Sequence, residues 1–306
     1  MEENLLVSVA MCTYNGSRFL TSQLDTIVNQ TYKNIEVIVV DDCSTDETWT
    51  ILKNYARQYP QFHIYQNESN LGFTGNFERA VSLCRGELIA LCDQDDLWHP
   101  EKIEIQVKSI GDNIFIYHDS EFIREDGESM NKKMSDVVHL YRGGDPLAFL
   151  FFNCVSGHTI LMKRDLLKFA IPLKKEYFHD WWLSYVATNI GNIDFVPQSL
   201  VKYRQHEKSE TNILRASREK DNYRLTSFEK SKKALNWFLQ CKLFRSNKNQ
   251  EIIEHFYSAN KKAIESFMSY KICWLMFSYW GTIFYTRKKT VFSNLNFIRK
   301  QMFGLN

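Results

Sequence analysis

Three carboxylates lie within four positions of the segment CDQDDLW, at Asp93, Asp95 and Asp96. Negative charges this close repel one another, and ionising all of them is costly unless a cation or hydrogen-bond donors compensate. Mg²⁺ and Mn²⁺ prefer oxygen ligands, and Mg²⁺ usually bridges one or two carboxylates to substrate phosphates. The spacing therefore indicates a divalent cation that holds a phosphate-bearing ligand. The alternative is a solvated acidic turn that caps a helix starting near Pro100.

An apolar run, ELIAL at 87–91, precedes the acidic segment and predicts a buried strand that positions it. Two earlier apolar runs are also followed by polar clusters, TYNGS at 13–17 and DDCSTD at 41–46. Ligands of parallel sheets bind beyond the carboxyl ends of the strands, and right-handed crossovers bring those ends to one edge. We therefore expect one crevice lined by acids and hydroxyls.

Short apolar runs alternate with longer amphipathic segments over the first 120 residues. The runs predict strands at 5–12, 35–40, 62–66 and 87–92, and the segments predict helices at 17–30, 44–59 and 74–84. This alternation predicts an α/β fold, with a mainly parallel sheet flanked by helices on both faces. Ser44, three residues before Glu47, matches a capping box at the expected start of the second helix.

The charge distribution divides the chain into two regions. Residues 1–205 contain 19 Lys and Arg and 28 Asp and Glu, whereas residues 206–306 contain 19 and 8, so the net charge of +2 hides an asymmetry. We therefore expect a ligand-binding α/β domain at 1–205 and a basic, aromatic-rich helical C-terminal region at 206–306.

Several classes of protein are disfavoured by what the sequence lacks. The seven cysteines show neither C-x-x-C pairs nor zinc-like spacing, which is typical of reduced thiols in a cytosolic protein. The segment MEENLLVSV carries acids where a secretory signal needs Lys or Arg, so we expect a cytoplasmic protein. The chain has no G-x-x-x-x-G-K-[ST], which disfavours a P-loop nucleotidase. NGS replaces the G-x-G-x-x-G that dinucleotide-binding folds place after the first strand, which disfavours a nicotinamide-dependent dehydrogenase.

Three segments, in order, resemble family 2 glycosyltransferases of the GT-A fold: VSVAMCTYNGSRFLTSQLDTIVNQTYKNIEVIVVDDCSTDET, NLGFTGNFERAV and GELIALCDQDDLWHPEKI. The resemblance covers residues 5–205, and it implies a nucleotide-sugar-binding catalytic domain with the DxD motif of these enzymes at 93–96. Two later segments, SGHTILMKRDLL and the stretch from HDWWLSYVA to YRQH, are similar to the bacterial rhamnosyltransferase branch, whose members build surface polysaccharides.

The resemblance implies a role for residues at each strand end. Those expected beside the nucleotide are Thr13, Tyr14, Asn15, Asp42, Asn70, Gly72 and Asn76, with Asp42 at the edge of the base. In the DxD region one carboxylate should contact ribose and one the metal, and the run permits either the Asp93–Asp95 or the Asp95–Asp96 register. Asp93 and Asp95 are therefore candidates for nucleotide binding, and Asp95 and Asp96 for binding Mg²⁺ or Mn²⁺.

Asp180, in FHDWW, matches the catalytic base of the family, with a helix cap as its alternative role. An inverting transferase makes one in-line displacement at the anomeric carbon, and a carboxylate must take the proton of the attacking hydroxyl. His206 could complete the metal site or lie on the surface, and Arg204 could contact the diphosphate. The candidates for stacking on a sugar ring, with packing in the core as the alternative, are Trp98, Trp181 and Trp182.

The resemblance implies an inverting, metal-dependent glycosyltransferase that moves a sugar from a nucleoside diphosphate donor to a saccharide or lipid-linked oligosaccharide. The favoured donor is dTDP-rhamnose. Two other functions stay open. One is a nucleotidyltransferase, which would need a basic, Gly-rich loop in place of TYNGSRF, and the other is a non-catalytic binder of sugar nucleotides or glycans.

The C-terminal segment KICWLMFSYWGTIFYTRKK joins aromatic residues to cations. This pattern suits peripheral contact with the inner face of the cytoplasmic membrane. The alternative is that the aromatic residues pack on the catalytic domain or on a second subunit. No recognisable nucleic-acid-binding module accompanies the basic residues, so we expect no nucleic acid partner.

Overall fold

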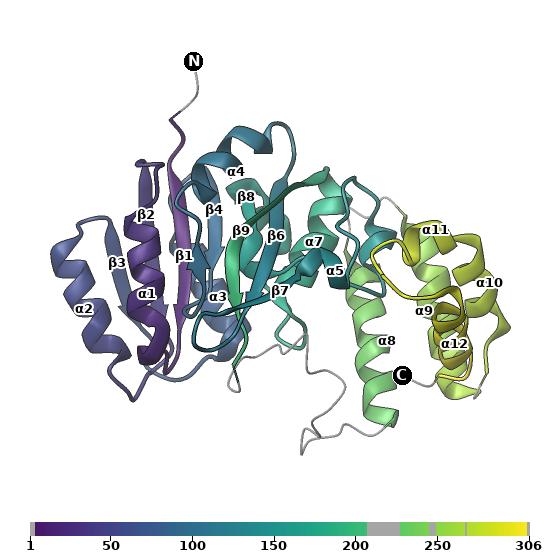
Figure 1. Ribbon diagram of the computed structural model, residues 1–306. Coiled ribbons are helices and arrows are strands. Elements are labelled where there is room, and N and C mark those ends of the chain that lie inside the picture. The colour runs from purple at the N-terminus through teal and green to yellow at the C-terminus, as the bar shows by residue number, and fades with distance from the viewer. Residues whose placement is uncertain (1–3, 207–226, 245–248, 267, 305–306) are drawn as a thin grey trace.

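The computed structural model describes residues 4–206, 227–244, 249–266 and 268–304 (Figure 1). Its strands are β1 (Val7–Thr13), β2 (Ile35–Asp41), β3 (Phe62–Gln66), β4 (Leu88–Cys92), β5 (Leu97–Trp98), β6 (Phe115–Ile123), β7 (Ser129–Lys133), β8 (Leu161–Lys163) and β9 (Ile193–Arg204). Its α-helices are α1 (Ser17–Val28), α2 (Thr48–Gln58), α3 (Gly72–Leu83), α4 (Lys102–Ile110), α5 (Met134–Val137), α6 (Leu167–Ala170), α7 (His179–Ile190), α8 (Ser227–Leu243), α9 (Gln250–Glu265), α10 (Tyr270–Ser278), α11 (Trp280–Ile283) and α12 (Val291–Met302). Short 3-10 helices are η1 (Pro146–Phe149), η2 (Gly157–Thr159) and η3 (Arg164–Leu166).

The strands form one nine-stranded sheet in the order β3-β2-β1-β4-β8-β6-β9-β5, with β7 paired to β6. The first four strands pair in parallel, and antiparallel pairs enter with β8, β7 and β5. Helices cover the sheet, and the C-terminal helices gather at the end of the molecule opposite α2 (Figure 1). The predicted α/β fold with a helix-flanked sheet is confirmed.

β1 is buried along its whole length, and its side chains alternate between two faces. Val7, Val9 and Met11 join the core beneath α1, α2 and α4, whereas Ala10 and Cys12 join the core that includes α3 and α7. A strand buried on both faces is apolar throughout, which explains why the run VSVAMC predicts it.

Parallel pairing places the carboxyl ends of β1, β2 and β4 at the same edge of the sheet. Thr13 of β1 pairs with Asp41 of β2, and Met11 of β1 pairs with Cys92, the last residue of β4. The polar segments that follow these strands therefore begin side by side, as the crossover rule requires.

The far side of the sheet fixes the acidic segment after β4. Leu97 of β5 pairs with Lys202 of β9, and the backbone N–H of Arg204 donates to Asp96 Oδ1 at 3.0 Å. The segment is thus held between the end of β4 and the end of β9.

The expected capping box at Ser44 is wrong. α2 begins at Thr48, and the Ser44 hydroxyl donates to Asp41 Oδ1 at 2.5 Å instead of capping a helix. Asp46 Oδ1 accepts the N–H of Thr48 at 3.0 Å. Ser44 is therefore used to hold the carboxylate at the end of β2, and the helix starts one turn later than the sequence indicated.

Aromatic residues of α8 pack in one hydrophobic core with α7 and the sheet. The ring of Trp237 lies 5.0 Å from that of Trp181 and 6.2 Å from that of Trp182, centroid to centroid, and its Nε1 donates to the carbonyl of Leu150 at 2.8 Å. The expected division of the chain at 205/206 stays a prediction, and residues 207–226 lie outside the described part. Among the helices of the described ranges, none is both long and apolar enough to cross a membrane.

Replacing Trp237 by Ala is expected to lower the free energy of unfolding by about 3–5 kcal/mol, because a buried aromatic ring is lost and a cavity remains. Urea denaturation followed by circular dichroism measures this change. The matched control is Trp274→Ala, at a tryptophan that is 64% exposed, for which we expect a change within about 0.5 kcal/mol. Equal losses of unfolding free energy in the two variants would contradict the packing of α8 in one core with α7.

Candidate functional site

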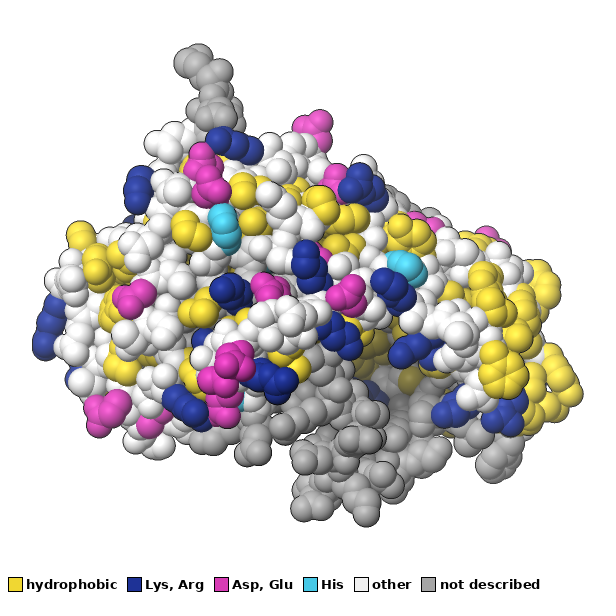
Figure 2. Space-filling view, in the orientation of Figure 1, with side chains coloured by type: hydrophobic (Ala, Val, Ile, Leu, Met, Phe, Trp, Pro, Cys, Tyr) yellow, Lys and Arg dark blue, Asp and Glu magenta, His cyan; other side chains and the backbone are white. Residues whose placement is uncertain are grey.

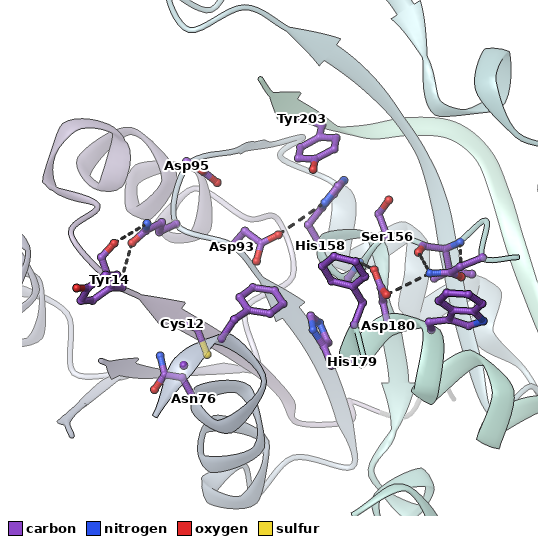
Figure 3. Close-up of a pocket in the computed structure, with 18 of the residues that line it drawn as sticks. Cys12, Tyr14, Asn76, Asp93, Asp95, Ser156, His158, His179, Asp180 and Tyr203 are labelled. Carbon is purple, nitrogen blue, oxygen red and sulfur yellow. Dashed lines mark hydrogen bonds and ion pairs between the residues drawn. The ribbon is translucent and has the colours of Figure 1, made fainter. Parts of the chain in front are cut away.

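A cavity of about 550 Å³ opens at the carboxyl ends of β1, β2 and β4. The residue 153–158 segment and the start of α7 form its other wall. Figure 3 shows Tyr14 and Asp95 toward one end, Asp180 toward the other, and Asp93 and His158 between them. The predicted site residues that line the cavity are Thr13, Tyr14, Asp42, Asn70, Gly72, Asn76, Asp93, Asp95, Asp180 and Trp181.

Asp42 organises the loop at one end of the cavity. Its Oδ1 accepts the N–H of Leu71 at 2.8 Å, and its Oδ2 accepts the N–H of Gly72 at 2.9 Å. Gly72 has φ of +74°, a conformation that favours glycine. Asn70 closes the same loop, since its Oδ1 accepts the N–H of Gly72 at 3.0 Å. This loop and Asn76 present amide and carboxylate groups to the cavity.

Asn15 does not line the cavity, so the expected nucleotide contact of this residue is not supported. Its backbone N–H donates to Ser44 Oγ at 2.9 Å, and its Oδ1 accepts the N–H of Thr45 at 2.8 Å. Asn15 therefore ties the segment after β1 to the segment after β2.

Gln94 links the segment after β1 to the acidic segment, and the sequence analysis missed it. Its Oε1 accepts the N–H of Tyr14 at 2.9 Å, and its Nε2 donates to the Tyr14 carbonyl at 3.1 Å. The two residues are 80 positions apart, so no local pattern could have indicated the contact.

His158 lies beside two of the three clustered carboxylates. Its Nδ1 is 3.8 Å from Asp93 Oδ2 and 3.6 Å from Asp96 Oδ2, and the three side chains form a group able to hold a metal ion. Burial lowers the pKa of His158 to about 3, so the imidazole is neutral and able to act as a ligand. His158 could not be predicted from the sequence, because only the fold brings it to the acidic segment.

The acidic residues of this group resist ionisation. Burial, followed by the charges of Asp95 and Asp180, raises the pKa of Asp93 to about 8. Burial and the charges of Asp95 and Asp93 also raise the pKa of Asp96. Among the residues that the structure describes, Asp96 Oδ2 and His158 Nε2 are buried and find no hydrogen-bond partner. Oxygen and imidazole donors with unmet bonding capacity fit a divalent cation.

A second pair of donors lies at the same acidic segment. His206 Nε2 is 2.7 Å from Asp95 Oδ2, and the His206 ring packs beside that of Phe19 at 5.1 Å between centroids. Asp95 lines the cavity, whereas Asp96 and His206 are not among its lining residues. The described residues thus offer two ligand sets, Asp95 with His206 and Asp93 with Asp96 and His158.

Asp180 lies in the first turn of α7, and its carboxylate faces the cavity (Figure 3). Its Oδ1 accepts from Asn153 Nδ2 at 3.1 Å, and its Oδ2 accepts the N–H of Gly157 at 3.2 Å. The N-cap position is Phe178, so Asp180 is not the cap residue. Burial raises the pKa of Asp180 to about 7, although the N–H groups of Trp181 and Gly157 oppose the rise. A carboxyl group that titrates near neutrality is well matched to accept a proton.

Two of the three tryptophans expected at the sugar are in the core instead. Trp98 is 3% exposed, with Lys102 Nζ 3.7 Å from its ring centroid, and Trp182 is 3% exposed and donates to the Ala170 carbonyl at 2.8 Å. Neither lines the cavity, so packing in the core, the alternative interpretation, describes both. Trp181 does line the cavity, and its Nε1 donates to the Phe149 carbonyl at 2.6 Å.

Arg204 does not line the cavity, and the expected diphosphate contact is not supported. Its Nε donates to the Asp95 carbonyl at 2.9 Å, and its Nη1 donates to the Glu125 carbonyl at 2.8 Å. The guanidinium group also lies over the Phe19 ring, 4.7 Å from the centroid. Arg204 therefore holds the acidic segment in place through backbone contacts.

Comparisons with known proteins indicate a glycosyltransferase. A family model described as glycosyl transferase family 2 matches residues 8–169. An uncharacterized glycosyltransferase of Haemophilus influenzae is 27% identical, over 88% of this chain and 91% of the relative. An uncharacterized glycosyltransferase of Rickettsia prowazekii is 30% identical, over 69% of each chain.

Solved structures share the fold. The chain resembles Staphylococcus aureus TarS 1–349 in complex with UDP-GlcNAc, with a TM-score of 0.60 and 16% identity over 97% of this chain and 81% of that one. It also resembles the mannosyltransferase PcManGT of Pyrobaculum calidifontis in complex with GDP-Man and Mn²⁺, with a TM-score of 0.52 and 15% identity over 96% and 79%.

Asp180→Asn is expected to raise the melting temperature more at about pH 8 than at about pH 5. The pKa of Asp180 is raised from 3.8 to about 7 in the folded state, so the unfolded chain releases this proton first and stability falls as pH rises through that range. Asn cannot ionise, so the variant does not lose this stability at high pH. The loss in the free energy of unfolding is on the order of 1 kcal/mol for a carboxyl partly open to a cavity.

Calorimetry of both proteins at the two pH values measures the difference. The comparison between pH values cancels any effect of lost hydrogen bonds that does not depend on pH. Asp112→Asn, at an exposed carboxylate, is the control and should show no pH-dependent gain. The same shift for Asp180→Asn at both pH values would contradict the raised pKa.

Proposed function

The chain belongs to glycosyltransferase family 2, and from this we propose that it is an inverting, metal-dependent enzyme that moves a sugar from a nucleoside diphosphate to a saccharide hydroxyl. The observation that carries the proposal is a single cavity with clustered metal-ligating groups at Asp93 and Asp95 and a separate carboxyl, Asp180, whose pKa is raised to about 7. The first set of groups suits a divalent cation that holds a diphosphate, and the carboxyl of Asp180 suits proton removal.

The nucleoside is assigned to the end of the cavity formed by Asp42 and its loop. Donors and acceptors there come from Tyr14, Asn70 and Asn76, and Asp93 is the carboxylate assigned to ribose. Structures of similar fold were solved with UDP-GlcNAc and with GDP-Man and Mn²⁺, which supports a nucleotide sugar as the donor class.

The metal is assigned to Asp95 and His206, because this pair combines a cavity-lining carboxylate with an imidazole nitrogen 2.7 Å away. Asp96 and His158 then support the site from beneath, since Asp96 is fully buried and does not line the cavity. A bound Mg²⁺ or Mn²⁺ would stabilise the charge that develops on the leaving nucleoside diphosphate.

Asp180 takes the proton of the acceptor hydroxyl as the hydroxyl oxygen attacks the anomeric carbon. The bond from that carbon to the diphosphate oxygen breaks, its electrons leave with the nucleoside diphosphate, and the configuration inverts. Asn153 and the N–H of Gly157 hold the carboxylate in position. One displacement completes the transfer, so no covalent enzyme intermediate is required.

For the substrates we favour dTDP-rhamnose as donor and a saccharide or lipid-linked oligosaccharide as acceptor, in surface polysaccharide assembly at the inner face of the cytoplasmic membrane. The likeness of residues 156–167 and 179–206 to the rhamnosyltransferase branch supports this choice. A nucleotidyltransferase is less well supported, because the cation of the segment TYNGSRF is Arg18, which lies in the first turn of α1 and pairs with Glu125.

Mn²⁺ together with dTDP or UDP is expected to raise the melting temperature of the protein, by an amount equivalent to about 2.7 kcal/mol at a hundredfold excess over Kd. Asp95→Asn and His206→Gln should each remove most of this shift, and EDTA should remove it from the wild type. His158→Gln is the matched imidazole variant and should keep it. Loss of the shift in His158→Gln but not in His206→Gln would assign the metal to the other ligand set.

Asp180→Asn is expected to lower kcat by a factor of about 10²–10⁴, since a general base is lost. Release of nucleoside diphosphate from dTDP-rhamnose, UDP-GlcNAc and GDP-mannose, with saccharide acceptors, measures turnover. The variant should keep the thermal shift with Mn²⁺ and nucleotide, and Asp112→Asn should behave like the wild type. Unchanged turnover in Asp180→Asn would remove this residue from the mechanism.

A further inference from the structure

Helices α10 and α12 expose large apolar side chains on the outside of the molecule, and we call this set the tail surface. It consists of Tyr270, Trp274 and Phe277 on α10 and Val291, Phe292 and Leu295 on α12. Trp274 is 64% exposed and Phe292 is 81% exposed. The two helices pack against each other, and Figure 2 shows hydrophobic side chains gathered over this end of the molecule.

The exposure follows from the spacing of the sequence. Tyr270, Trp274 and Phe277 recur at intervals of four and three residues, which is one face of a helix. The opposite face of α10 is also apolar, and its residues Ile272 and Met276 are fully buried. One apolar face of α10 therefore packs in the core, and a second apolar face of the same helix is exposed to solvent. Such patches mark interaction sites.

The segment that carries the tail surface has charges of a single sign. No Asp or Glu follows Glu265, whereas six cations do. They are Lys271, Arg287, Lys288, Lys289, Arg299 and Lys300, and all but Arg287 are exposed. The rest of the chain holds 32 Lys and Arg against 36 Asp and Glu, so the net charge of the chain becomes positive only with this segment.

These cations are not neutralised within the described ranges. Arg287 Nη1 and Arg299 Nη2 donate to asparagine side-chain oxygens, each at 3.0 Å, and Lys288 Nζ donates to the Ser135 carbonyl at 2.9 Å. The ion pairs of the described chain involve other residues. A partner for the tail surface must therefore accept aromatic side chains and supply negative charge together.

We propose that the tail surface docks on an anionic lipid bilayer. Exposed Trp, Tyr and Phe side chains enter the boundary between headgroups and acyl chains, while Lys and Arg attract anionic headgroups. A second copy of the chain is a poorer occupant, because a symmetric contact would bring the same cations face to face. Lipid binding of this kind does not depend on the transfer chemistry.

The segment between α11 and α12, which leads into the tail surface, contacts one wall of the cavity. Arg287 forms a backbone bridge with Val138, and Lys288 reaches the carbonyl of Ser135. Met134 and Val138, in the same short segment, line the cavity. Docking would therefore hold this wall of the cavity beside the lipid.

Co-sedimentation of the full chain with vesicles tests the proposal. Vesicles of phosphatidylcholine with about 30 mol% phosphatidylglycerol should bind the protein, and vesicles of phosphatidylcholine alone should bind it much less. Binding should weaken in about 0.5 M salt, where screening is short-ranged. Trp274→Ser with Phe292→Ser, and separately Lys271→Gln with Lys289→Gln, should each reduce binding about tenfold or more.

Matched controls come from other parts of the molecule. Phe169→Ser removes an exposed aromatic ring from α6, and Lys53→Gln with Arg57→Gln removes two exposed cations from α2, at the far end of the molecule (Figure 1). These variants should bind vesicles as the wild type does. All variants should keep the thermal shift with Mn²⁺ and nucleotide, which separates lipid docking from the proposed transfer activity.

Three results would overturn the proposal. The first is a wild-type protein that does not bind phosphatidylglycerol vesicles. The second is undiminished vesicle binding by both the aromatic double variant and the lysine double variant. The third is a stable dimer in analytical ultracentrifugation that Trp274→Ser with Phe292→Ser converts to monomer. That result would assign the surface to a second copy of the chain.

Discussion

The crowding of negative charge at the end of β4 is the constraint on which the site depends. Asp93, Asp95 and Asp96 leave the strand together, and burial makes the ionisation of Asp93 and Asp96 costly. For Asp96, the backbone N–H of Arg204 and the charge of its guanidinium group offset part of this cost. A bound cation would lower the cost for both of these carboxylates at once. Charge compensation and ligand binding are therefore the same event in this proposal.

The two ends of the cavity are built by different parts of the chain. The acidic end depends on β4, β5 and the last residues of β9, whereas Asp180 is held by α7, Asn153 and Gly157. α7 is in turn packed on α8 through the tryptophans around Trp237. The C-terminal helices thus contribute to the position of Asp180, although they supply no residue that lines the cavity in the described ranges.

The sequence predicted the parallel half of the fold well, and its failures have physical causes. The strand at 62–66 and the strand starting at Ile35 begin where expected, because buried parallel strands are apolar throughout. The start of α2 was misplaced because Asp41 competes for the Ser44 hydroxyl. Most residues expected around the cavity line it, since strand ends fix them. His158, Gln94 and Asn153 were missed because their partners are 27 or more positions away.

The tryptophans show a further limit of local patterns. Trp181 and Trp182 are adjacent on α7, and the sequence could not decide which of them faces the cavity. Tertiary packing decides which of the two faces the cavity. The Trp237 ring lies beside both, but Trp182 is buried and donates to the Ala170 carbonyl, whereas Trp181 remains at the cavity wall. Trp98 was ambiguous for a similar reason, and the ammonium group of Lys102 lies over its ring.

The paired hydrogen bonds between Gln94 and the backbone of Tyr14 connect the loop after β1 to the acidic segment. Any shift of the acidic segment on cation binding is transmitted directly to a loop assigned to the nucleotide. The two ligands would then bind cooperatively, and thermodynamic reciprocity requires each to change the affinity for the other by the same factor. Nucleotide release after transfer would in the same way loosen the hold on the ion.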